Sequence, residues 1–398
     1  MSSTAYIVIK GVGSVSPLGY IPEDINTAYH TATSPIQTSP FNGKLVPVAS
    51  LPETVESYLA AIRRENRFYK TIDRTASLAI AAARQAVVQA SWGTEKEVTI
   101  NIGSSRGATG LFEKYYDDFH RDPGQLSPQA SPATTLGNIS SWVARDLATD
   151  GPVISHSVTC STALQAMANG FAWLKSGMAN RFLAGAAEAP LTPFTVAQMQ
   201  ALGIYSPNKF NDYWCRPLNL AKQNTFVLGE GAAVFALERL SVANIPPSAI
   251  CLEAIGFGFE NIPSRTGISP QGLHFRKAMQ QALAQLPYAD QTIDAIVLHA
   301  PGTVAGDQAE INAIRAIFTN NIPVLTSNKM LIGHTLGASA ALSLEYAINI
   351  LNTQQILGFP YPVFFDNKTN PKFFRRILLL SAGFGGNAAA LIVRKWES

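Results

Sequence analysis

The chain has 398 residues, of which 47% are hydrophobic and 14% are charged, with 30 lysines and arginines against 27 acidic residues. Disordered chains are rich in charge and poor in apolar residues, so this composition excludes disorder. Soluble proteins carry about 25% charged residues, and the low value here predicts that much surface lies inside the fold or under a partner subunit. The two charge signs are interspersed, which disfavours nucleic-acid binding.

Cysteine usage and the chain ends bear on the cellular compartment. Cys160, Cys215 and Cys251 are too few and too scattered for a disulfide framework or a zinc site, and they fit a reducing cytoplasm. The first residues lack a basic region followed by an apolar core, so no signal peptide is expected. The apolar run 331–351 contains His334 and Glu345, which favours a buried helix over a membrane span.

Short β-rich runs alternate with alanine-rich helical runs. In chain order, strands are expected at 98–103, 152–158, 181–187, 232–238, 295–299, 324–328 and 377–381, and the clearest helices at 75–90, 161–174, 309–318 and 338–351. Most are apolar on nearly all sides, which indicates a layered α/β architecture. The proline-containing stretch 241–249 predicts a boundary between an N-terminal part, 1–245, and a C-terminal part, 246–398.

Two glycine-rich segments invite a nucleotide-binding interpretation. Residues 11–19 (GVGSVSPLG) have Ser16 where a dinucleotide fingerprint needs its third glycine, and Pro17 interrupts any following helix. Nucleotide binding is therefore disfavoured there. Residues 383–386 (GFGG) follow a strand late in the chain and predict a tight turn.

Cys160 lies between the predicted strand 152–158 and the predicted helix that begins at 161. A thiol at this position feels the positive end of the helix dipole, which is expected to lower its pKa and favour the thiolate. The carboxyl edge of a sheet is also where α/β proteins bind ligands, with the sulfur expected to be exposed there. This feature alone leaves open a nucleophile and a buried structural cysteine.

Two histidines stand at equivalent strand ends. His299 ends the strand 295–299, and His334 follows the strand 324–328 just ahead of a helix. A neutral imidazole donates a hydrogen bond to a developing oxyanion or polarises a carbonyl that is losing CO2. The remaining histidines lack such placement and are expected to be structural or at the surface: His30, His120, His156 and His274.

Further residues accompany this set. Lys329 and Glu310 form either a buried pair that holds the two histidine loops together or two ordinary surface charges. Phe384 is expected to place its backbone N–H beside Cys160, with Gly383 and Gly385 allowing the close approach and contacting substrate. The backbone N–H groups of Cys160 and Phe384 would together form an oxyanion hole for a thioester carbonyl. A core phenylalanine is the alternative for Phe384.

These motifs together resemble the β-ketoacyl-acyl carrier protein synthases of the thiolase superfamily, of the elongating Cys-His-His type. The resemblance covers nearly the whole chain, through GVGSVSPLG, Asp73-Arg74, GPVISHSVTCSTALQA, LAGAAEAP, CRPLNLAKQNTFVLGEGAAVFALE, HAPGTVAGDQAE, SNKMLIGHTLGASA and SAGFGGNAAALIV. It implies a five-layered αβαβα fold built from two related halves. It also implies an acyl carrier protein as partner and a homodimer, or a heterodimer with a related synthase or chain-length factor.

The resemblance implies roles for single residues. Cys160 would accept the acyl chain as a thioester, while His299 and His334 would bind the malonyl thioester and assist decarboxylation. The Cys160 and Phe384 amides would hold the oxyanion. No metal, nucleotide or bound cofactor is implied.

Supporting roles follow from the same resemblance. Lys329 would pair with Glu310 and organise the site, Phe384 would act as a gate, and Thr303 would hydrogen-bond the phosphopantetheine arm of the carrier protein.

The chain also departs from the family pattern. Pro301 stands where a threonine is usual, Ser343 where a glutamate is frequent, and Ala382-Gly383 where the pair before Phe384 is bulkier. Fatty acid synthesis is the ordinary role of the family, and these departures suggest a specialised polyketide or polyene pathway as the alternative. Two alternatives stay open: a cysteine acyltransferase that does not condense, and a non-condensing partner resembling a chain-length factor.

Overall fold

The computed structural model describes residues 5–207, 212–262, 267–287, 290–319, 321–365 and 371–397. Its strands are β1 (Ala5–Val15), β2 (Gln37–Phe41), β3 (Lys44–Ala49), β4 (Thr99–Gly103), β5 (Val153–Ile154), β6 (Arg181–Glu188), β7 (Leu228–Gly229), β8 (Gly231–Ser241), β9 (Ile250–Phe259), β10 (Ala295–Val297), β11 (Val324–Thr326), β12 (Arg376–Gly383) and β13 (Asn387–Lys395).

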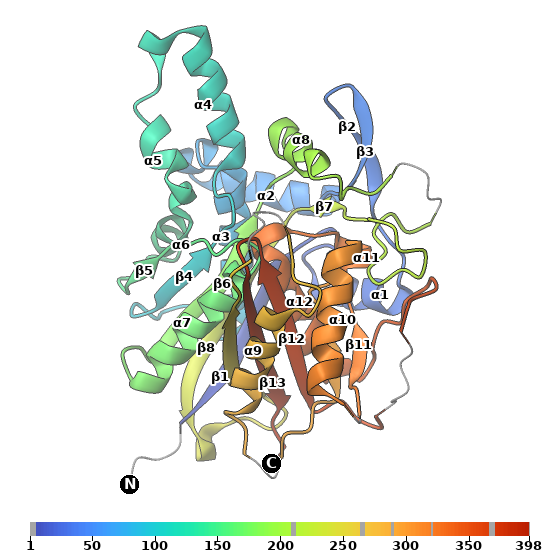
Figure 1. Cartoon of the computed structure of the whole chain (residues 1–398). Helices are drawn as coiled ribbons and strands as arrows, with labels where there is room; N and C mark the ends of the chain where they lie inside the picture. The colour runs from blue at the N-terminus through green and yellow to red at the C-terminus, as the bar shows by residue number, and fades with distance from the viewer. Residues whose placement is uncertain are drawn as a thin grey trace.

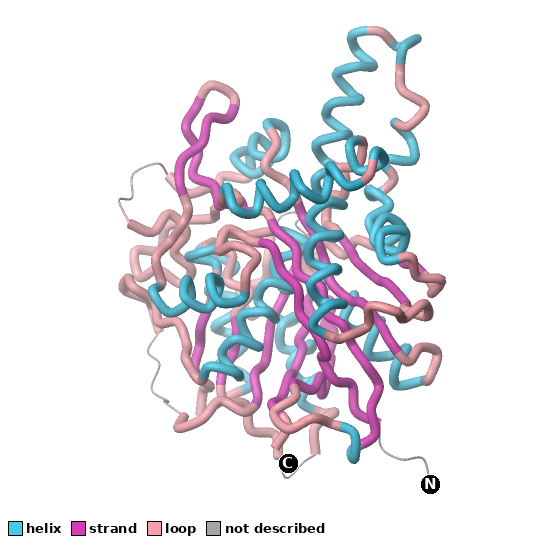
Figure 2. The backbone as a smooth tube through the Cα atoms, turned by 180° about the vertical axis from the view of Figure 1, so that it is seen from behind, coloured by secondary structure: helices cyan, strands magenta, loops and turns pink. Residues whose placement is uncertain are grey.

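The helices lie between these strands. They are α1 (Pro22–Thr31), α2 (Glu53–Glu65), α3 (Arg74–Gln89), α4 (Thr109–Arg121), α5 (Ala130–Thr134), α6 (Ile139–Leu147), α7 (Thr162–Ser176), α8 (Pro193–Ala201), α9 (Leu273–Leu283), α10 (Val304–Ile317), α11 (Lys329–Ile332) and α12 (Ser339–Thr353). Helix α4 and the hairpin β2–β3 project from the body that the other elements form (Figures 1 and 2).

The central sheet consists of two halves with the same topology. Its order is β11-β10-β12-β13-β9-β1-β8-β6-β4-β5. In the N-terminal half, β5, β4 and β6 are parallel, β8 pairs antiparallel with β6, and β1 pairs antiparallel with β8. The C-terminal half repeats this pattern: β11, β10 and β12 are parallel, β13 pairs antiparallel with β12, and β9 pairs antiparallel with β13. The halves join where β1 pairs antiparallel with β9. This internal symmetry confirms the expectation of two related halves.

Helices cover both faces of each half-sheet. Helices α7 and α12 pack against one another between the halves, α3 and α6 cover the outer face of the N-terminal half, and α9 and α10 cover the outer face of the C-terminal half. The strands alternate accordingly: Phe182 faces the central helices and Leu183 the outer ones. The result is the expected αβαβα layering, and it explains why the helix that begins near 161 has almost no polar face.

Several predicted elements match the structure and three strands are shorter. The strands at 98–103, 181–187, 232–238 and 377–381 are confirmed by β4, β6, β8 and β12. The expected strands 152–158, 295–299 and 324–328 end early, because the chain leaves the sheet to build loops around a cavity. The run 331–351 comprises the end of α11, a loop and α12, and among the described residues no helix is long and apolar enough to cross a bilayer.

Gly11 and Gly13 of the segment 11–19 serve packing. They lie in β1, against α3. A Cβ atom on Gly11 would stand 2.1 Å from the carbonyl oxygen of Ala86, and one on Gly13 would stand 2.0 Å from that of Ala82. Only glycine permits this approach of strand and helix, which accounts for the motif without a nucleotide.

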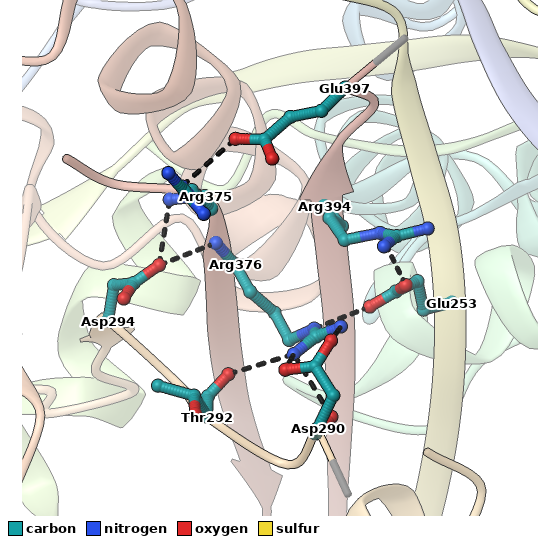
Figure 3. A network of polar contacts seen from close by, with 8 residues as sticks. All are labelled: Glu253, Asp290, Thr292, Asp294, Arg375, Arg376, Arg394 and Glu397. Carbon is teal, nitrogen blue, oxygen red and sulfur yellow. Dashed lines mark hydrogen bonds and ion pairs between the residues drawn. The ribbon is translucent and has the colours of Figure 1, made fainter. Parts of the chain in front are cut away.

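A charged network fixes the end of the C-terminal half-sheet that lies away from the 383–386 turn (Figure 3). Arg376, at the start of β12, is bound by Glu253 at 2.7 Å and by Asp290 at 2.9 Å, and Glu253 also binds Arg394 at 2.6 Å. Asp294 accepts the backbone N–H of Arg376 at 2.8 Å. Because removing one partner strands a buried charge, this network favours a single register for β9, β12 and β13.

The contact between β1 and α3 can be tested by adding one methyl group. Gly13→Ala should destabilise the fold by about 3 kcal/mol, since its Cβ cannot fit beside the Ala82 carbonyl without displacing backbone. Urea unfolding followed by circular dichroism measures the difference. Gly93→Ala is the matched control, because a Cβ there meets nothing within 4 Å. Equal midpoints for the two variants would contradict the packing role.

Candidate active site

One cavity of about 380 Å³ collects the loops that follow strands of both halves. Cys160 reaches it from the loop between β5 and α7, His299 from the loop after β10, and His334 from the loop after β11. Strands β5 and β11 are the edge strands at the two ends of the sheet, so Cys160 and His334 sit in topologically equivalent loops. The structure thus brings together three residues that sequence analysis singled out separately.

Cys160 is buried, and its thiol is not the exposed thiolate that was expected. Its side chain packs among apolar neighbours that include Met199, Phe226 and Leu336. Burial, together with the charge of Glu188, raises the pKa of Cys160 to about 12. The dipole argument was wrong on its own, because it ignored the desolvation that accompanies burial.

The ring of His334 has a defined proton arrangement. Its Nδ1 atom accepts a hydrogen bond from the backbone N–H of Leu336 at 3.0 Å, so Nε2 carries the proton of the neutral ring. Burial, together with the charge of Lys329, lowers the pKa of His334 to about 3. His334 is therefore a neutral hydrogen-bond donor at neutral pH.

His299 lies beside His334, with ring centroids 5.3 Å apart and ring planes nearly perpendicular at 88°. Burial, with electrostatic interactions from His334 and Lys329, holds the pKa of His299 well below its usual value. Within the described ranges, neither ring nitrogen of His299 is hydrogen-bonded to the protein. The cavity thus presents two neutral imidazoles to a bound molecule.

Two carboxylates from α10 hold the loop that carries His299. Glu310 accepts the backbone N–H groups of His299 and Ala300, each at 2.7 Å. Asp307 accepts those of residues 302 and 303, each at 3.1 Å. Thr303 and Pro301 line the cavity at this loop. Sequence analysis missed Asp307, although its spacing of three from Glu310 places both on one helix face.

Lys329 and Glu310 are both fully buried, so the alternative of two surface charges is wrong. Within the described ranges they form no direct ion pair: Lys329 Nζ donates to Ser343 Oγ at 2.9 Å. Burial lowers the pKa of Lys329 to about 8, and the charge of Glu310 opposes that shift. The two groups interact through space, and Ser343 is the direct partner.

Glu188, at the end of β6, is a further residue that sequence analysis left without a role. Its buried carboxylate accepts a hydrogen bond from Ser104 Oγ at 2.7 Å, from the N–H groups of residues 105 and 106, and from that of Gly337 at 2.9 Å. It therefore joins the loop after β4 to the His334 loop. The only sequence signal is an acid that ends an otherwise apolar strand.

The turn at 383–386 is confirmed as the connection between β12 and β13. Phe384 is 44% exposed and lines the cavity, so it is not a core residue. A Cβ on Gly383 would stand 1.8 Å from Thr159 Oγ1, which shows how closely the turn approaches the Cys160 loop. Gly385 has φ +90°, a conformation that glycine adopts most readily.

Of the four histidines expected to be structural or exposed, three fit that description. His30 and His120 are exposed, and His156 is hydrogen-bonded by Asn101. His274 differs, because it is buried and lines the same cavity. In the described part of the chain, no group of three or more His, Cys, Asp or Glu residues is arranged to hold a metal ion.

Two family models match the chain. The model of the β-ketoacyl synthase N-terminal domain matches residues 6–243, and that of the β-ketoacyl synthase C-terminal domain matches residues 251–359. The N-terminal match alone covers more than half of the chain.

Individual proteins agree with this match. The chain is 25% identical to a 3-oxoacyl-acyl-carrier-protein synthase 2 of Staphylococcus aureus (strain COL), covering 100% of both chains. It is 27% identical to a putative polyketide beta-ketoacyl synthase 1 of Streptomyces cyaneus, covering 98% of both. The solved structure of the ishigamide ketosynthase/chain length factor superposes with a TM-score of 0.83 at 21% identity, over 98% of this chain and 99% of that one.

The protonation state of Cys160 predicts how the free protein reacts with an alkylating agent. Because burial raises the pKa of Cys160 to about 12, the rate of iodoacetamide labelling should rise about tenfold per pH unit between pH 7 and 10. Peptide mass spectrometry separates Cys160 from Cys215 and Cys251, and Cys160→Ala should lose this labelled peptide. A plateau near pH 7 would show instead that the helix dipole controls the thiol.

Proposed function

The chain belongs to the β-ketoacyl synthase family, and on this premise we propose that it condenses an acyl group held on Cys160 with a malonyl group on an acyl carrier protein, with loss of CO2. One observation carries the assignment of residues: Cys160, His299 and His334 face a single cavity. A buried structural cysteine would not need two neutral histidines on the same cavity wall.

In the first step, Cys160 takes the acyl group from its carrier. The Cys160 sulfur bonds to the thioester carbonyl carbon, the bond from that carbon to the carrier's sulfur breaks, and the thiol proton passes to the departing carrier thiolate. The protein supports this step by holding the Cys160 loop, since Ser381 Oγ donates to the Cys160 carbonyl at 2.9 Å. Covalent catalysis of this kind divides a difficult bond formation into two easier ones.

In the second step, the malonyl thioester loses CO2. The bond between its methylene carbon and its carboxylate breaks, and the electron pair forms an enolate whose charge lies on the thioester oxygen. His334 donates its Nε2–H to that oxygen, and neutral His299 supplies a second donor from the perpendicular ring. Neutrality matters, because each ring must donate a proton in a hydrogen bond without transferring it.

The enolate carbon then attacks the acyl carbonyl on Cys160. The new C–C bond forms, the tetrahedral oxyanion collapses with cleavage of the C–S bond, and the departing Cys160 thiolate takes up a proton from solvent. We assign the backbone N–H groups of Cys160 and Phe384 to this oxyanion, because the turn packs directly on the Cys160 loop through Gly383. Preorganised N–H donors of this kind act most strongly in a buried, dry site.

Other residues act through these. Glu310 holds the backbone beside His299, while burial and the positive charge of Lys329 keep both rings neutral. Thr303, at the cavity wall, binds the phosphopantetheine arm in this proposal. The electron pair for the new bond comes from the C–CO2 bond, so the reaction requires no bound cofactor.

The relatives support a proposal about the partners of this chain. The name of the 3-oxoacyl-acyl-carrier-protein synthase includes an acyl carrier protein as the substrate carrier. The solved structure of the ishigamide ketosynthase is described together with a chain length factor. We propose an acyl carrier protein and a second synthase-like subunit as partners here. We also propose that the boundary between the two halves falls near residue 245, so that the N-terminal half spans 1–245 and the C-terminal half spans 246–398.

The proposed roles separate in a two-stage experiment with intact-protein mass spectrometry. Wild-type protein should gain an acyl adduct from acyl-carrier protein and lose it when malonyl-carrier protein is added, as a ketoacyl product two carbons longer appears. Cys160→Ala should form no adduct. His299→Ala and His334→Ala should form the adduct but condense at least about 100-fold more slowly, since each loses a donor to the enolate oxygen.

Each contrary outcome would refute a specific part of the proposed function. An adduct that only hydrolyses would establish a cysteine acyltransferase, and the absence of any adduct, with or without a partner subunit, would establish a non-condensing protein. Normal condensation by the His334→Ala protein would remove the role given to that residue.

A further inference from the structure

A buried histidine, paired with a partly buried carboxylate, forms part of the cavity wall beyond the Cys-His-His set. His274, at the start of α9, is 1% exposed and lines the cavity. Its Nδ1 atom lies 3.0 Å from Oε2 of Glu260, which directly follows β9. Glu260 also accepts Ser269 Oγ at 2.8 Å, so the carboxylate is held by two side chains.

This pair adjoins the 383–386 turn. The backbone N–H of Glu260 donates to the carbonyl of Gly386 at 2.9 Å, and both Gly386 and His274 line the cavity. The ring of His274 lies 4.6 Å from that of Phe275, whose ring lies 6.3 Å from His299. His274 therefore stands one aromatic ring away from the proposed reacting centre.

The contact with Glu260 decides which hydrogen-bonding group His274 offers. Burial opposes ionisation of Glu260, but the bonds from Ser269 and His274 outweigh it and hold the pKa of Glu260 below its usual value. An ionised carboxylate only accepts hydrogen bonds, so Nδ1 of His274 carries the proton. Burial lowers the pKa of His274 in spite of Glu260. The ring is then neutral, and its Nε2 is a lone-pair acceptor.

In the described part of the chain, that acceptor has no hydrogen-bonding partner. Nε2 of His274 is also not among the fully enclosed, unpaired polar atoms of the described residues. Much of the surrounding wall is apolar and includes Ile262, Ile268 and Phe275. A single acceptor in an apolar wall is the arrangement by which binding sites fix the orientation of a ligand.

We propose that His274 is a substrate-binding residue whose Nε2 accepts a hydrogen bond from an N–H or O–H group of the thioester substrate, with Glu260 as the positioning residue that fixes its tautomer. This inference rests on the proposed condensing function. The donor has two possible sources, an amide N–H of the pantetheine arm or a hydroxyl on the acyl chain. Both present the same chemistry to His274.

Three substitutions separate the acceptor from the shape of the ring. His274→Phe keeps a ring and removes both polar atoms. His274→Asn keeps a donor near Nδ1 for Glu260 but has no atom at the Nε2 position, and His274→Gln places an amide oxygen near that position. The Phe and Asn variants should lower kcat/KM for condensation about 5- to 10-fold, and the Gln variant should recover most of that loss.

Substrate pairs identify the source of the donor. Butyryl and 3-hydroxybutyryl groups on the carrier protein differ only by a hydroxyl, and malonyl-pantetheine differs from the malonyl thioester of ethanethiol only by the arm that carries the amides. A loss confined to 3-hydroxybutyryl assigns the acyl hydroxyl. A loss for both acyl groups that disappears with the ethanethiol thioester assigns the arm. The acylation rate of Cys160 is measured in parallel with both acyl groups.

Two results would overturn the inference. The Phe variant could match wild type with every substrate in both acylation and condensation, or the Phe variant could retain activity while Asn and Gln lose it equally, which would indicate packing alone. His30→Gln, at an exposed site on α1, is the control. Wild-type protein that acylates without condensing would refute the proposed function instead, while the acylation rates would still test His274.

Discussion

A loop that leaves the end of a buried strand carries backbone N–H groups with no strand to accept them, and each costs about 1–3 kcal/mol if it stays unpaired. Around this cavity, buried carboxylates supply the acceptors. Glu188, Asp307 and Glu310 each take two or three backbone N–H groups from these loops: those that hold the two histidines and the loop after β4. The positions of His299 and His334 depend on these acids, which never need to touch a substrate.

Burial has a second effect in the same place, because it disfavours every charge. It raises the pKa of the Cys160 thiol and of the carboxyls, and it lowers the pKa of the histidines and of Lys329. One physical cause thus prepares a protonated thiol and two neutral imidazoles, and the charge of Lys329 adds to its effect on both rings. The chemistry proposed for the cavity uses each of these states as the resting one.

The sequence is most informative where a short motif follows a strand. Cys160, His299 and His334 could be assigned to one edge because the carboxyl ends of parallel strands meet there. The lengths of β5, β10 and β11 were overestimated, since apolar residues continue into the loops after the ladder has ended.

The supporting residues could not be found in this way. Glu188 and Gly337 are 149 positions apart, and their contact exists only once both halves are folded. The pKa of Cys160 was misjudged for the same reason, because a dipole is local whereas burial comes from tertiary packing. His274 was assigned to the structural or surface histidines, since nothing near it in the sequence indicates that α9 begins at a cavity.

The strand order within each half also constrains how the chain folds. The first strand of a half pairs with its last one, so that Ala5 of β1 meets Ser241 of β8, and β9 meets β13 at the far end of the chain. Such non-local pairing makes folding slow, because a long loop must close before its contacts form. During synthesis, β1 therefore lacks its antiparallel partner until β8 has emerged from the ribosome, and the backbone N–H and C=O groups along its edges stay unpaired with a strand. The edge of β1 must be protected from aggregation while the chain is being synthesised, although in the folded protein it is covered by β8 and β9.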